Sequence, residues 1–143
     1  MIKAGIIGAT GYAGNEIVRL LLGHKDVEIK WFGSRSYIDQ QYADIYQNFF
    51  RLVDAKCMDD NMAALADEVD VIFTATPQGL CASLINEEIL SKCKVIDLSA
   101  DFRIKDVKNM RSGTGSSIRL RSLSRKLFMA SARLTVRILR MQG

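Results

Sequence analysis

The stretch that decides the fold follows the initial methionine and reads Ile2-Lys3-Ala4-Gly5-Ile6-Ile7-Gly8-Ala9-Thr10-Gly11-Tyr12-Ala13-Gly14. An apolar run of strand length leads into a turn in which every third residue is glycine. An amphipathic stretch, residues 15–22, follows directly. This pattern predicts a β-strand, a tight turn and an α-helix in immediate succession.

Each of the three glycines of the turn meets a different steric requirement. Gly8 can adopt backbone angles that a side chain forbids, Gly11 lets the main chain approach a pyrophosphate, and Gly14 lets the helix pack close to the strand. The free N–H groups at the start of the helix then face the anion. We therefore predict a dinucleotide-binding turn, and a plain strand-to-helix turn is the alternative interpretation.

The following residues alternate between strand and helix patterns. Strands are predicted over 27–33, 69–75 and 94–98, with a further short strand over 52–57. Helices are predicted over 79–93 and from a cap at Asp59 or Asp60 to residue 68, whereas residues 34–50 show no clear period. This alternation predicts an α/β fold, a Rossmann-type parallel sheet with helices on both faces. Ligands bind such sheets beyond the carboxyl ends of the strands.

The second strand end, Gly33-Ser34-Arg35-Ser36, indicates which dinucleotide the domain takes. It lies about 20 residues past Gly14, where domains that bind NAD carry an acid for the ribose hydroxyls. No acid stands there. Arg35, flanked by two serines, offers a planar fork of donors that suits a 2′-phosphate. This favours NADP over NAD, and an exposed loop arginine without a ligand is the alternative.

Polar residues also follow the next two predicted strands. Thr76 and Pro77 stand in a turn after residues 69–75, where backbone groups line a cofactor or merely punctuate the chain. Ser99, Asp101 and Arg103 follow the strand predicted over 94–98, and this partly cationic cluster suits a carboxylate or a phosphate. A local ion pair between Asp101 and Arg103 with a purely structural role is the alternative.

These segments together carry a resemblance to a known family. The glycine turn, the loop 34–36, residues 75–79 and above all Asp97-Leu98-Ser99-Ala100-Asp101-Phe102-Arg103 resemble N-acetyl-gamma-glutamyl-phosphate reductases, in matching order and spacing over residues 1 to about 109. That family reduces an acyl phosphate to N-acetylglutamate semialdehyde in arginine biosynthesis, takes hydride from NADPH, and is similar in plan to aspartate-semialdehyde dehydrogenase.

The resemblance implies a role for each matching position. The residues implied to hold the pyrophosphate are Gly8, Thr10, Gly11, Tyr12, Ala13 and Gly14. Those implied to hold the 2′-phosphate are Ser34 and Arg35, with Ser36 beside them. Those implied to lie near the nicotinamide half are Thr76, Pro77 and Ser99. Arg103 is implied to meet the substrate phosphate, and a common family pattern has His where Gln78 stands here.

The nucleophile that this chemistry needs is missing from the sequence. A thiolate must displace phosphate from the acyl group, and in the family it stands in an N-P-G-C segment that this chain lacks. Cys57, Cys81 and Cys93 show no C-x-x-C spacing, so we predict packing thiols, with no metal site and no disulfide. The single histidine, His24, falls at the end of the first helix, which favours a surface role. We therefore expect cofactor binding but no catalytic residue.

Charge divides the chain near residue 109. Residues 1–109 carry 12 Lys and Arg against 16 Asp and Glu, whereas residues 110–143 carry 8 Lys and Arg and no acid. We therefore predict an NADP-binding domain over 1–109, a basic tail rich in Ser and Arg over 110–143, and no catalytic domain. One interpretation of the tail is an arm that binds nucleic acid or an anionic membrane.

The interpretation that we favour is an out-of-frame translation. Codons can be chosen for Asn109 to Thr135 so that reading from the last base of the Asn109 codon gives YEKWYGIEHKAPEFIEEAVYGLCEIN, which resembles the family's continuation after Arg103. The codons of Met110 and Met129 allow no choice, and both fit. Coding DNA that uses a different set of codons would exclude the shifted frame.

Composition bounds the remaining possibilities. No apolar run reaches membrane-spanning length, and the first residues lack the layout of a signal peptide. We expect a cytoplasmic protein with a small-molecule substrate, no nucleic-acid or membrane partner, and the homo-oligomeric assembly of the full-length family. Two alternatives stay open: another semialdehyde dehydrogenase, or a non-catalytic module that binds NADP or nucleic acid.

Overall fold

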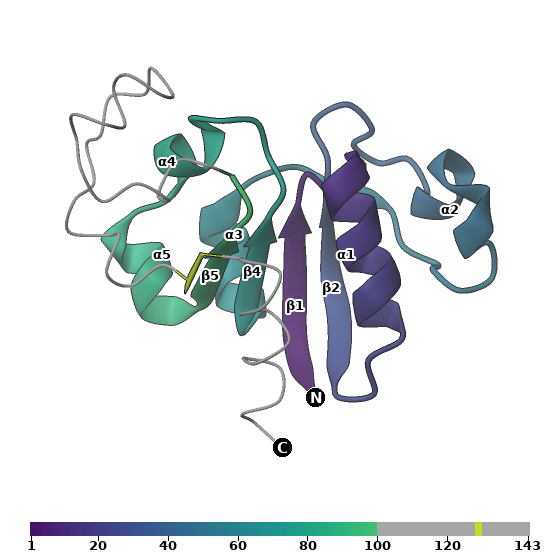
Figure 1. Cartoon of the computed structure of the whole chain (residues 1–143), viewed down its shortest axis with the longest axis horizontal. Coiled ribbons are helices and arrows are strands. Elements are labelled where there is room, and N and C mark those ends of the chain that lie inside the picture. The colour runs from purple at the N-terminus through teal and green to yellow at the C-terminus, as the bar shows by residue number, and fades with distance from the viewer. Residues whose placement is uncertain (100–127, 130–143) are drawn as a thin grey trace.

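The computed structural model describes residues 1–99 and 128–129, which build a parallel sheet with helices on both faces (Figure 1). The strand order is β3-β2-β1-β4-β5-β6. The strands are β1 (Ile2–Ile7), β2 (Val27–Gly33), β3 (Cys57–Met58), β4 (Val71–Thr74), β5 (Lys94–Asp97) and β6 (Phe128–Met129). The helices are α1 (Tyr12–Leu22), α2 (Tyr42–Ile45), the short 3₁₀ helix η1 (Gln47–Phe49), α3 (Met62–Glu68), α4 (Leu80–Leu84) and α5 (Glu87–Lys92). The predicted Rossmann-type fold is confirmed.

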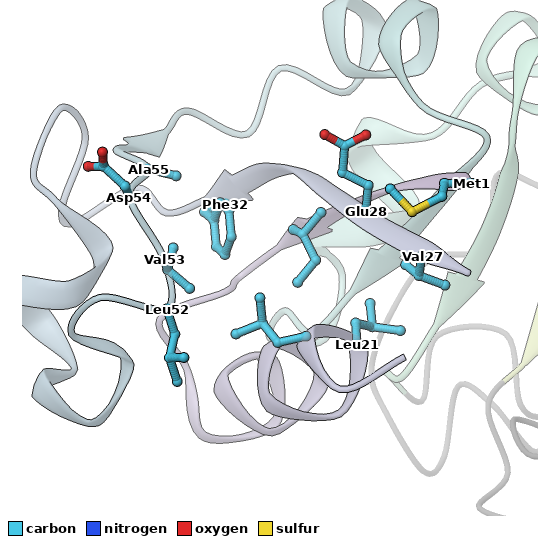
Figure 2. Close-up of a pocket in the computed structure, with 11 residues that line it drawn as sticks. Met1, Leu21, Val27, Glu28, Phe32, Leu52, Val53, Asp54 and Ala55 are labelled. Carbon is cyan, nitrogen blue, oxygen red and sulfur yellow. The ribbon is translucent and has the colours of Figure 1, made fainter. Parts of the chain in front are cut away.

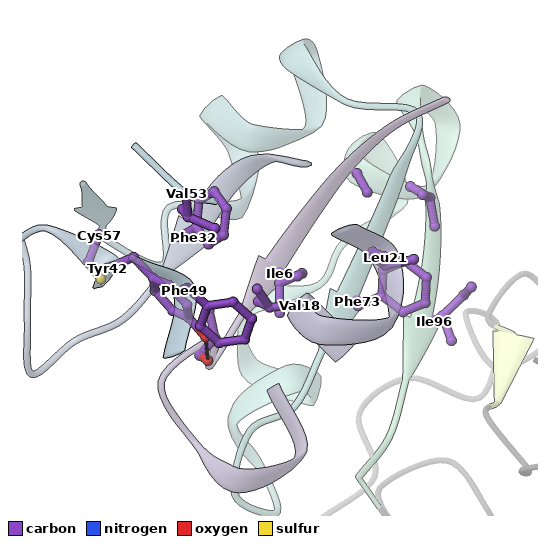
Figure 3. Packing of buried hydrophobic residues seen from close by; sticks show 13 residues of the cluster. Ile6, Val18, Leu21, Phe32, Tyr42, Phe49, Val53, Cys57, Phe73 and Ile96 are labelled. Atoms are coloured by element: carbon purple, nitrogen blue, oxygen red, sulfur yellow. Dashed lines mark hydrogen bonds between the residues drawn. The ribbon is translucent and has the colours of Figure 1, made fainter. Parts of the chain in front are cut away.

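Successive residues of the central strands enter two separate hydrophobic clusters. Ile7, Ile72 and Val95 pack with α3, α4 and α5 on one face. Ile6 and Phe73 point the other way, into a cluster with α1 and α2 that Figure 3 shows. Because side chains alternate across a strand, a sheet covered on both faces needs continuous apolar runs. This is why the apolar runs in the sequence located the buried strands β4 and β5.

The strand register brings the predicted strand ends to one level. Ile7 pairs with Gly33 on one side and with Thr74 on the other, and Thr74 in turn pairs with Asp97. The loops that leave β1, β2, β4 and β5 therefore begin at the same edge of the sheet. That edge carries the candidate site.

Three predicted elements differ from the structure. The helix predicted over 79–93 is two helices, because the Asn86 side chain accepts a hydrogen bond from the Ile89 N–H at 2.9 Å and so begins α5. The cap of α3 is Asn61, not Asp59 or Asp60, since the Asp59 carboxylate accepts from the Asn61 N–H instead. The strand predicted over 52–57 is wrong except at its last residue, and the unassigned stretch 34–50 contains α2 and η1.

The three cysteines are free and buried, as predicted for packing thiols. Cys81 and Cys93 belong to the cluster on the α3 face, and Cys57 to the cluster on the α1 face. Burial raises the pKa of the Cys57 thiol, and it raises the pKa of Cys93 to about 11. No group of His, Cys, Asp and Glu within the described residues could hold a metal ion. Among the same residues, no helix is long and apolar enough to cross a membrane.

Replacing Gly14 tests the close crossing of α1 over the turn. A Cβ at Gly14 would lie 2.0 Å from the carbonyl oxygen of Gly8, so we expect Gly14→Ala to lower the free energy of unfolding by about 2 kcal/mol or more. Gly23→Ala is the matched control, because its Cβ would lie 3.7 Å from the Leu20 oxygen, an ordinary contact. Urea unfolding followed by the fluorescence of Trp31, the single tryptophan, measures both variants. Equal stability of the two variants would contradict this packing.

Thiol labelling tests the burial of the cysteines. Because the thiolate is the reactive form and burial raises the pKa of two of these thiols, we expect the native chain to resist a disulfide reagent at pH 8 and to react only in denaturant. The Cys93 pKa rises from 9.0 to about 11 in the folded state, so the free energy of unfolding should fall as the pH climbs between these values. Rapid labelling of native protein would refute the burial.

Candidate functional site

The turn between β1 and α1 is held against the end of β4. Gly8 has a φ of +79°, and a Cβ there would lie 2.3 Å from the Ala75 carbonyl oxygen. Gly11 is less confined, since its nearest contact would be the Gly8 oxygen at 3.4 Å. Gly8 and Gly14 are therefore required by the packing of the protein itself. Gly11 is exposed, and a Cβ there would make only ordinary contacts with the protein.

Every carbonyl group of this turn has a hydrogen-bond donor within the protein. The oxygen of Gly8 accepts from the Gly11 N–H at 3.0 Å, and that of Gly11 accepts from the Asn15 N–H at 2.8 Å. The oxygen of Ala9 accepts from the Tyr42 hydroxyl at 2.9 Å. The Tyr46 hydroxyl donates to the oxygen of Thr10 at 2.8 Å. No carbonyl oxygen of residues 8–11 is thus left without a donor.

The N–H groups of the same turn are only partly used. Gly8 and Ala9 both donate to the Gly33 oxygen, at 3.0 and 2.8 Å. Within the part of the chain that the structure describes, no acceptor pairs with the N–H groups of Thr10, Tyr12, Ala13 and Gly14. The first N–H groups of an α-helix carry partial positive charge, and here they stand at the start of α1, a helix of eleven residues. The turn therefore offers an excess of donors, as an anion requires.

The hydroxyls of Thr10 and Ser34 join the first two strand ends. Their oxygens lie 2.7 Å apart, and Ser34 is buried. The Ser34 N–H donates to the Met58 oxygen at 2.7 Å, which ties the same residue to β3. Ser34 thus faces the glycine turn, whereas Arg35 and Ser36 are exposed. The structure brings Ser34 and Thr10 together, and it leaves Arg35 to project from the edge.

Asp60 is a member of this region that the sequence reasoning missed. The Arg35 Nε donates to its Oδ2, and the two side chains form an ion pair in which Asp60 is the more buried partner. Between residues 1 and 99, no acceptor pairs with the two terminal nitrogens of Arg35. Asp60 enters from the loop after β3, 25 residues further along the chain. The sequence pattern predicts only a helix cap for this carboxylate.

A buried polar network closes the other side of the site. The Asp97 carboxylate accepts from the Thr74 hydroxyl at 2.7 Å, the Ser99 N–H at 3.0 Å and the Ser99 hydroxyl at 2.6 Å. The two bonds from Ser99 are charge-assisted, and they fix the backbone where it leaves β5. Thr76 lies beside Gly8, and its Oγ1 is buried without a hydrogen-bond partner among the described residues. Pro77 is exposed. Arg103, Asp101 and the basic tail 110–143 lie outside the described residues, apart from β6.

A pocket of about 290 Å³ lies elsewhere, between α1, β2 and the segment 52–55 (Figure 2). Met1, Leu21 and Val27 line one part of it, and Val53 lines another. Met1 and Val27 mark the amino ends of β1 and β2, the side of the sheet away from the glycine turn. None of the predicted site residues lines this pocket.

Solved structures share this fold. An aspartate semialdehyde dehydrogenase with NADP from Candida albicans superposes with a TM-score of 0.60 over 90% of this chain and 41% of that one, at 19% identity. An aspartate semialdehyde dehydrogenase from Francisella tularensis gives a TM-score of 0.52 over 73% of this chain and 28% of that one, at 20% identity. At these identities the comparison concerns the fold alone.

Sequence relatives are much closer. The N-acetyl-gamma-glutamyl-phosphate reductase of Lachnospira eligens is 82% identical over 107 residues, which are 75% of this chain and 31% of the relative. The reductase of that name from Lachnoclostridium phytofermentans is 64% identical over 115 residues, 80% of this chain and 33% of the relative. The chain spans about a third of the length of these relatives, and the resemblance inferred from the sequence is confirmed. The family described as semialdehyde dehydrogenase, NAD binding domain, matches residues 3–136, so this chain belongs to that family.

Proposed function

We propose that residues 1–109 form the NADP-binding domain of an N-acetyl-gamma-glutamyl-phosphate reductase, the enzyme that reduces N-acetyl-gamma-glutamyl phosphate to N-acetylglutamate semialdehyde. The observation that carries this proposal is the hydrogen bonding of the glycine turn: the carbonyl oxygens of residues 8–11 all accept hydrogen bonds, and four N–H groups have no acceptor among the described residues. The 82% identity to a reductase of that name supports the choice of substrate over that of aspartate semialdehyde dehydrogenases, which match at about 20%.

The pyrophosphate of the cofactor would lie on the open N–H groups of the glycine turn. Thr10, Tyr12, Ala13 and Gly14 supply these donors, while Gly11 leaves room for the main chain to approach the phosphates. Hydrogen bonds from neutral N–H groups to an anion are stronger than those to neutral acceptors. This arrangement holds a doubly charged bridge without a lysine.

The 2′-phosphate would lie at Arg35, with Ser36 beside it. Asp60 holds the guanidinium by its Nε edge and leaves the terminal nitrogens available, which is the edge that grips a phosphate through two parallel bonds. The Ser34 hydroxyl bonds with that of Thr10, and it therefore links the loop of the 2′-phosphate to the turn that would hold the pyrophosphate. Asp60 also lowers the net positive charge at this point, so phosphate recognition depends on the fork geometry of Arg35 more than on charge alone.

The nicotinamide half would lie toward β4 and β5. Thr76 presents a buried hydroxyl that no described residue uses, and Ser99 is fixed by Asp97, so both can position a ligand without rearrangement. NADPH, when bound, supplies the hydride that reduces the acyl group. The thiolate for the covalent step would not come from Cys57, Cys81 or Cys93, all of which are buried in packing positions. We assign Thr76 and Ser99 to binding the cofactor, and neither of them to the covalent step.

The remaining assignments follow from the same proposal. Arg103 would contact the substrate phosphate, and residues 110–143 would contribute the edge strand β6 to the cofactor domain but no residue that binds the cofactor. The whole enzyme would act in the cytoplasm as a homo-oligomer on a small-molecule substrate, with no nucleic-acid partner. The identity to proteins named N-acetyl-gamma-glutamyl-phosphate reductase supports the small-molecule substrate.

Replacing Arg35 tests the choice of cofactor. We expect Arg35→Ala to weaken NADPH binding about tenfold or more, because a charged hydrogen-bond donor to phosphate is lost, and to change NADH binding less than about twofold. Arg19→Ala is the matched control. Arg19 likewise pairs with a carboxylate, that of Glu16, but it lies in the last turn of α1, away from the glycine turn. Calorimetric titration of the full chain measures each affinity. Equal weakening of NADPH and NADH, or none, would overturn the assignment of the 2′-phosphate.

A further inference from the structure

Two tyrosines from the segment between β2 and β3 reach the glycine turn from outside it. Tyr42 is the first residue of α2 and Tyr46 is the residue that follows its last, and their rings pack together with centres 5.6 Å apart. Their hydroxyls donate to consecutive carbonyl oxygens of the turn, those of Ala9 and Thr10. The Tyr42 hydroxyl also lies 3.0 Å from the Asn15 Oδ1, so its single proton is shared between that oxygen and the Ala9 carbonyl oxygen, which is 2.9 Å away.

We propose that Tyr42 and Tyr46 are positioning residues for the cofactor: both hold a carbonyl oxygen of the turn, that of Ala9 or of Thr10, away from the pyrophosphate, and Tyr42 thereby aims the Thr10 N–H at it. The inference rests on the proposed function of the glycine turn. It assigns a role to a segment whose sequence shows no clear period, and it makes the selectivity of the turn for anions depend on two hydroxyl groups.

Peptide planarity links each carbonyl to the next N–H group. The C=O of one residue and the N–H of the next lie in one plane and point in opposite directions. Tyr42 fixes the oxygen of Ala9 and therefore directs the Thr10 N–H to the opposite side, where it finds no acceptor among residues 1–99. Tyr46 fixes the oxygen of Thr10, and the following N–H, that of Gly11, closes the turn onto Gly8. Each hydroxyl thus sets the direction of one peptide unit.

Electrostatics explains why these two carbonyls need donors. A carbonyl oxygen carries partial negative charge, and one that faced the phosphates would repel them and offset the attraction of a neighbouring N–H. A backbone carbonyl without a partner near the anion would also have to give up its solvation when the cofactor binds. Bonding both oxygens to tyrosine removes both costs before the ligand arrives, which is preorganisation of the site.

The first tyrosine is held rigidly enough for this task. Tyr42 is fully buried, and its ring lies 5.0 Å from that of Phe32 and 5.6 Å from that of Phe49, centre to centre. Its N–H donates to the Ala55 oxygen at 2.9 Å, which fastens the start of α2. Burial raises the pKa of the Tyr42 hydroxyl well above its usual range, so the group remains a neutral donor at every physiological pH. Tyr46 packs on Tyr42, with the ring centres 5.6 Å apart.

Removal of single hydroxyl groups tests the proposal in the full chain. The variants are Tyr42→Phe and Tyr46→Phe, with Tyr37→Phe as the matched control, because no described residue pairs with the Tyr37 hydroxyl. Affinities are measured for NADPH and for adenosine 2′-monophosphate, which carries the 2′-phosphate but no pyrophosphate. We expect each test variant to weaken NADPH about fivefold, the effect of one hydrogen bond, and to change the affinity for the smaller ligand less than about twofold.

The outcomes separate this proposal from the proposed function. If NADPH binds the unchanged chain but equally well to both tyrosine variants, the positioning role is overturned and the cofactor site stands. Equal weakening of both ligands also overturns it, because that pattern indicates general loosening of the structure. If the unchanged chain binds neither ligand, the proposed function itself fails. Thermal melting identifies a variant that does not fold, and because Tyr46 is only half-buried, Tyr46→Phe still provides the test if Tyr42→Phe unfolds.

Discussion

The close contact between Gly14 and the carbonyl of Gly8 is the constraint on which the rest of the site depends. It lets the first turn of α1 rest directly on Gly8 and Ala9 of the loop from β1. Gly8 reinforces this by its contact with the backbone of Ala75 and its positive φ. The result is a loop whose open backbone groups are donors. Such a loop suits an anion before any charged side chain takes part.

Side chains then tie the neighbouring strand ends to this loop. The hydroxyl pair of Thr10 and Ser34 joins the ends of β1 and β2, and the Asp97 carboxylate joins β5 to Thr74 at the end of β4. These bonds are buried or half-buried, where an unpaired partner would be costly. They make the edge of the sheet one connected structure, so a cofactor that spans it meets groups that are already in place.

The fold was predictable because burial on both faces leaves a strong signal. The run Val27 to Gly33 matches β2 residue for residue, and the glycine turn lies where the pattern placed it. Short elements were less predictable, since a single Asn86 side chain divides the helix expected over 79–93. Within the candidate site, the glycines, Ser34 and Arg35 are predicted from local pattern, but the burial of Ser34 beside Thr10 is not.

The missing parts of the site are those that act across the chain. Asp60 meets Arg35 from 25 residues away, and Tyr46 meets Thr10 from 36 residues away. Neither contact leaves a periodic pattern, because each depends on where the loops after β2 and β3 fold back. Tyr42 and Tyr46 pack as ordinary aromatic residues, and only the positions of their hydroxyl groups connect them to the glycine turn.

The central claim is that the open N–H groups of the glycine turn receive the pyrophosphate. Titration of ¹⁵N-labelled chain with NADPH, followed by backbone amide resonances, measures this directly. The account predicts that the largest shifts fall on the amides of Thr10, Tyr12, Ala13 and Gly14, while those of Gly8 and Ala9, already bonded to Gly33, move little. Saturating NADPH that shifted amides elsewhere and left these four unchanged would contradict it.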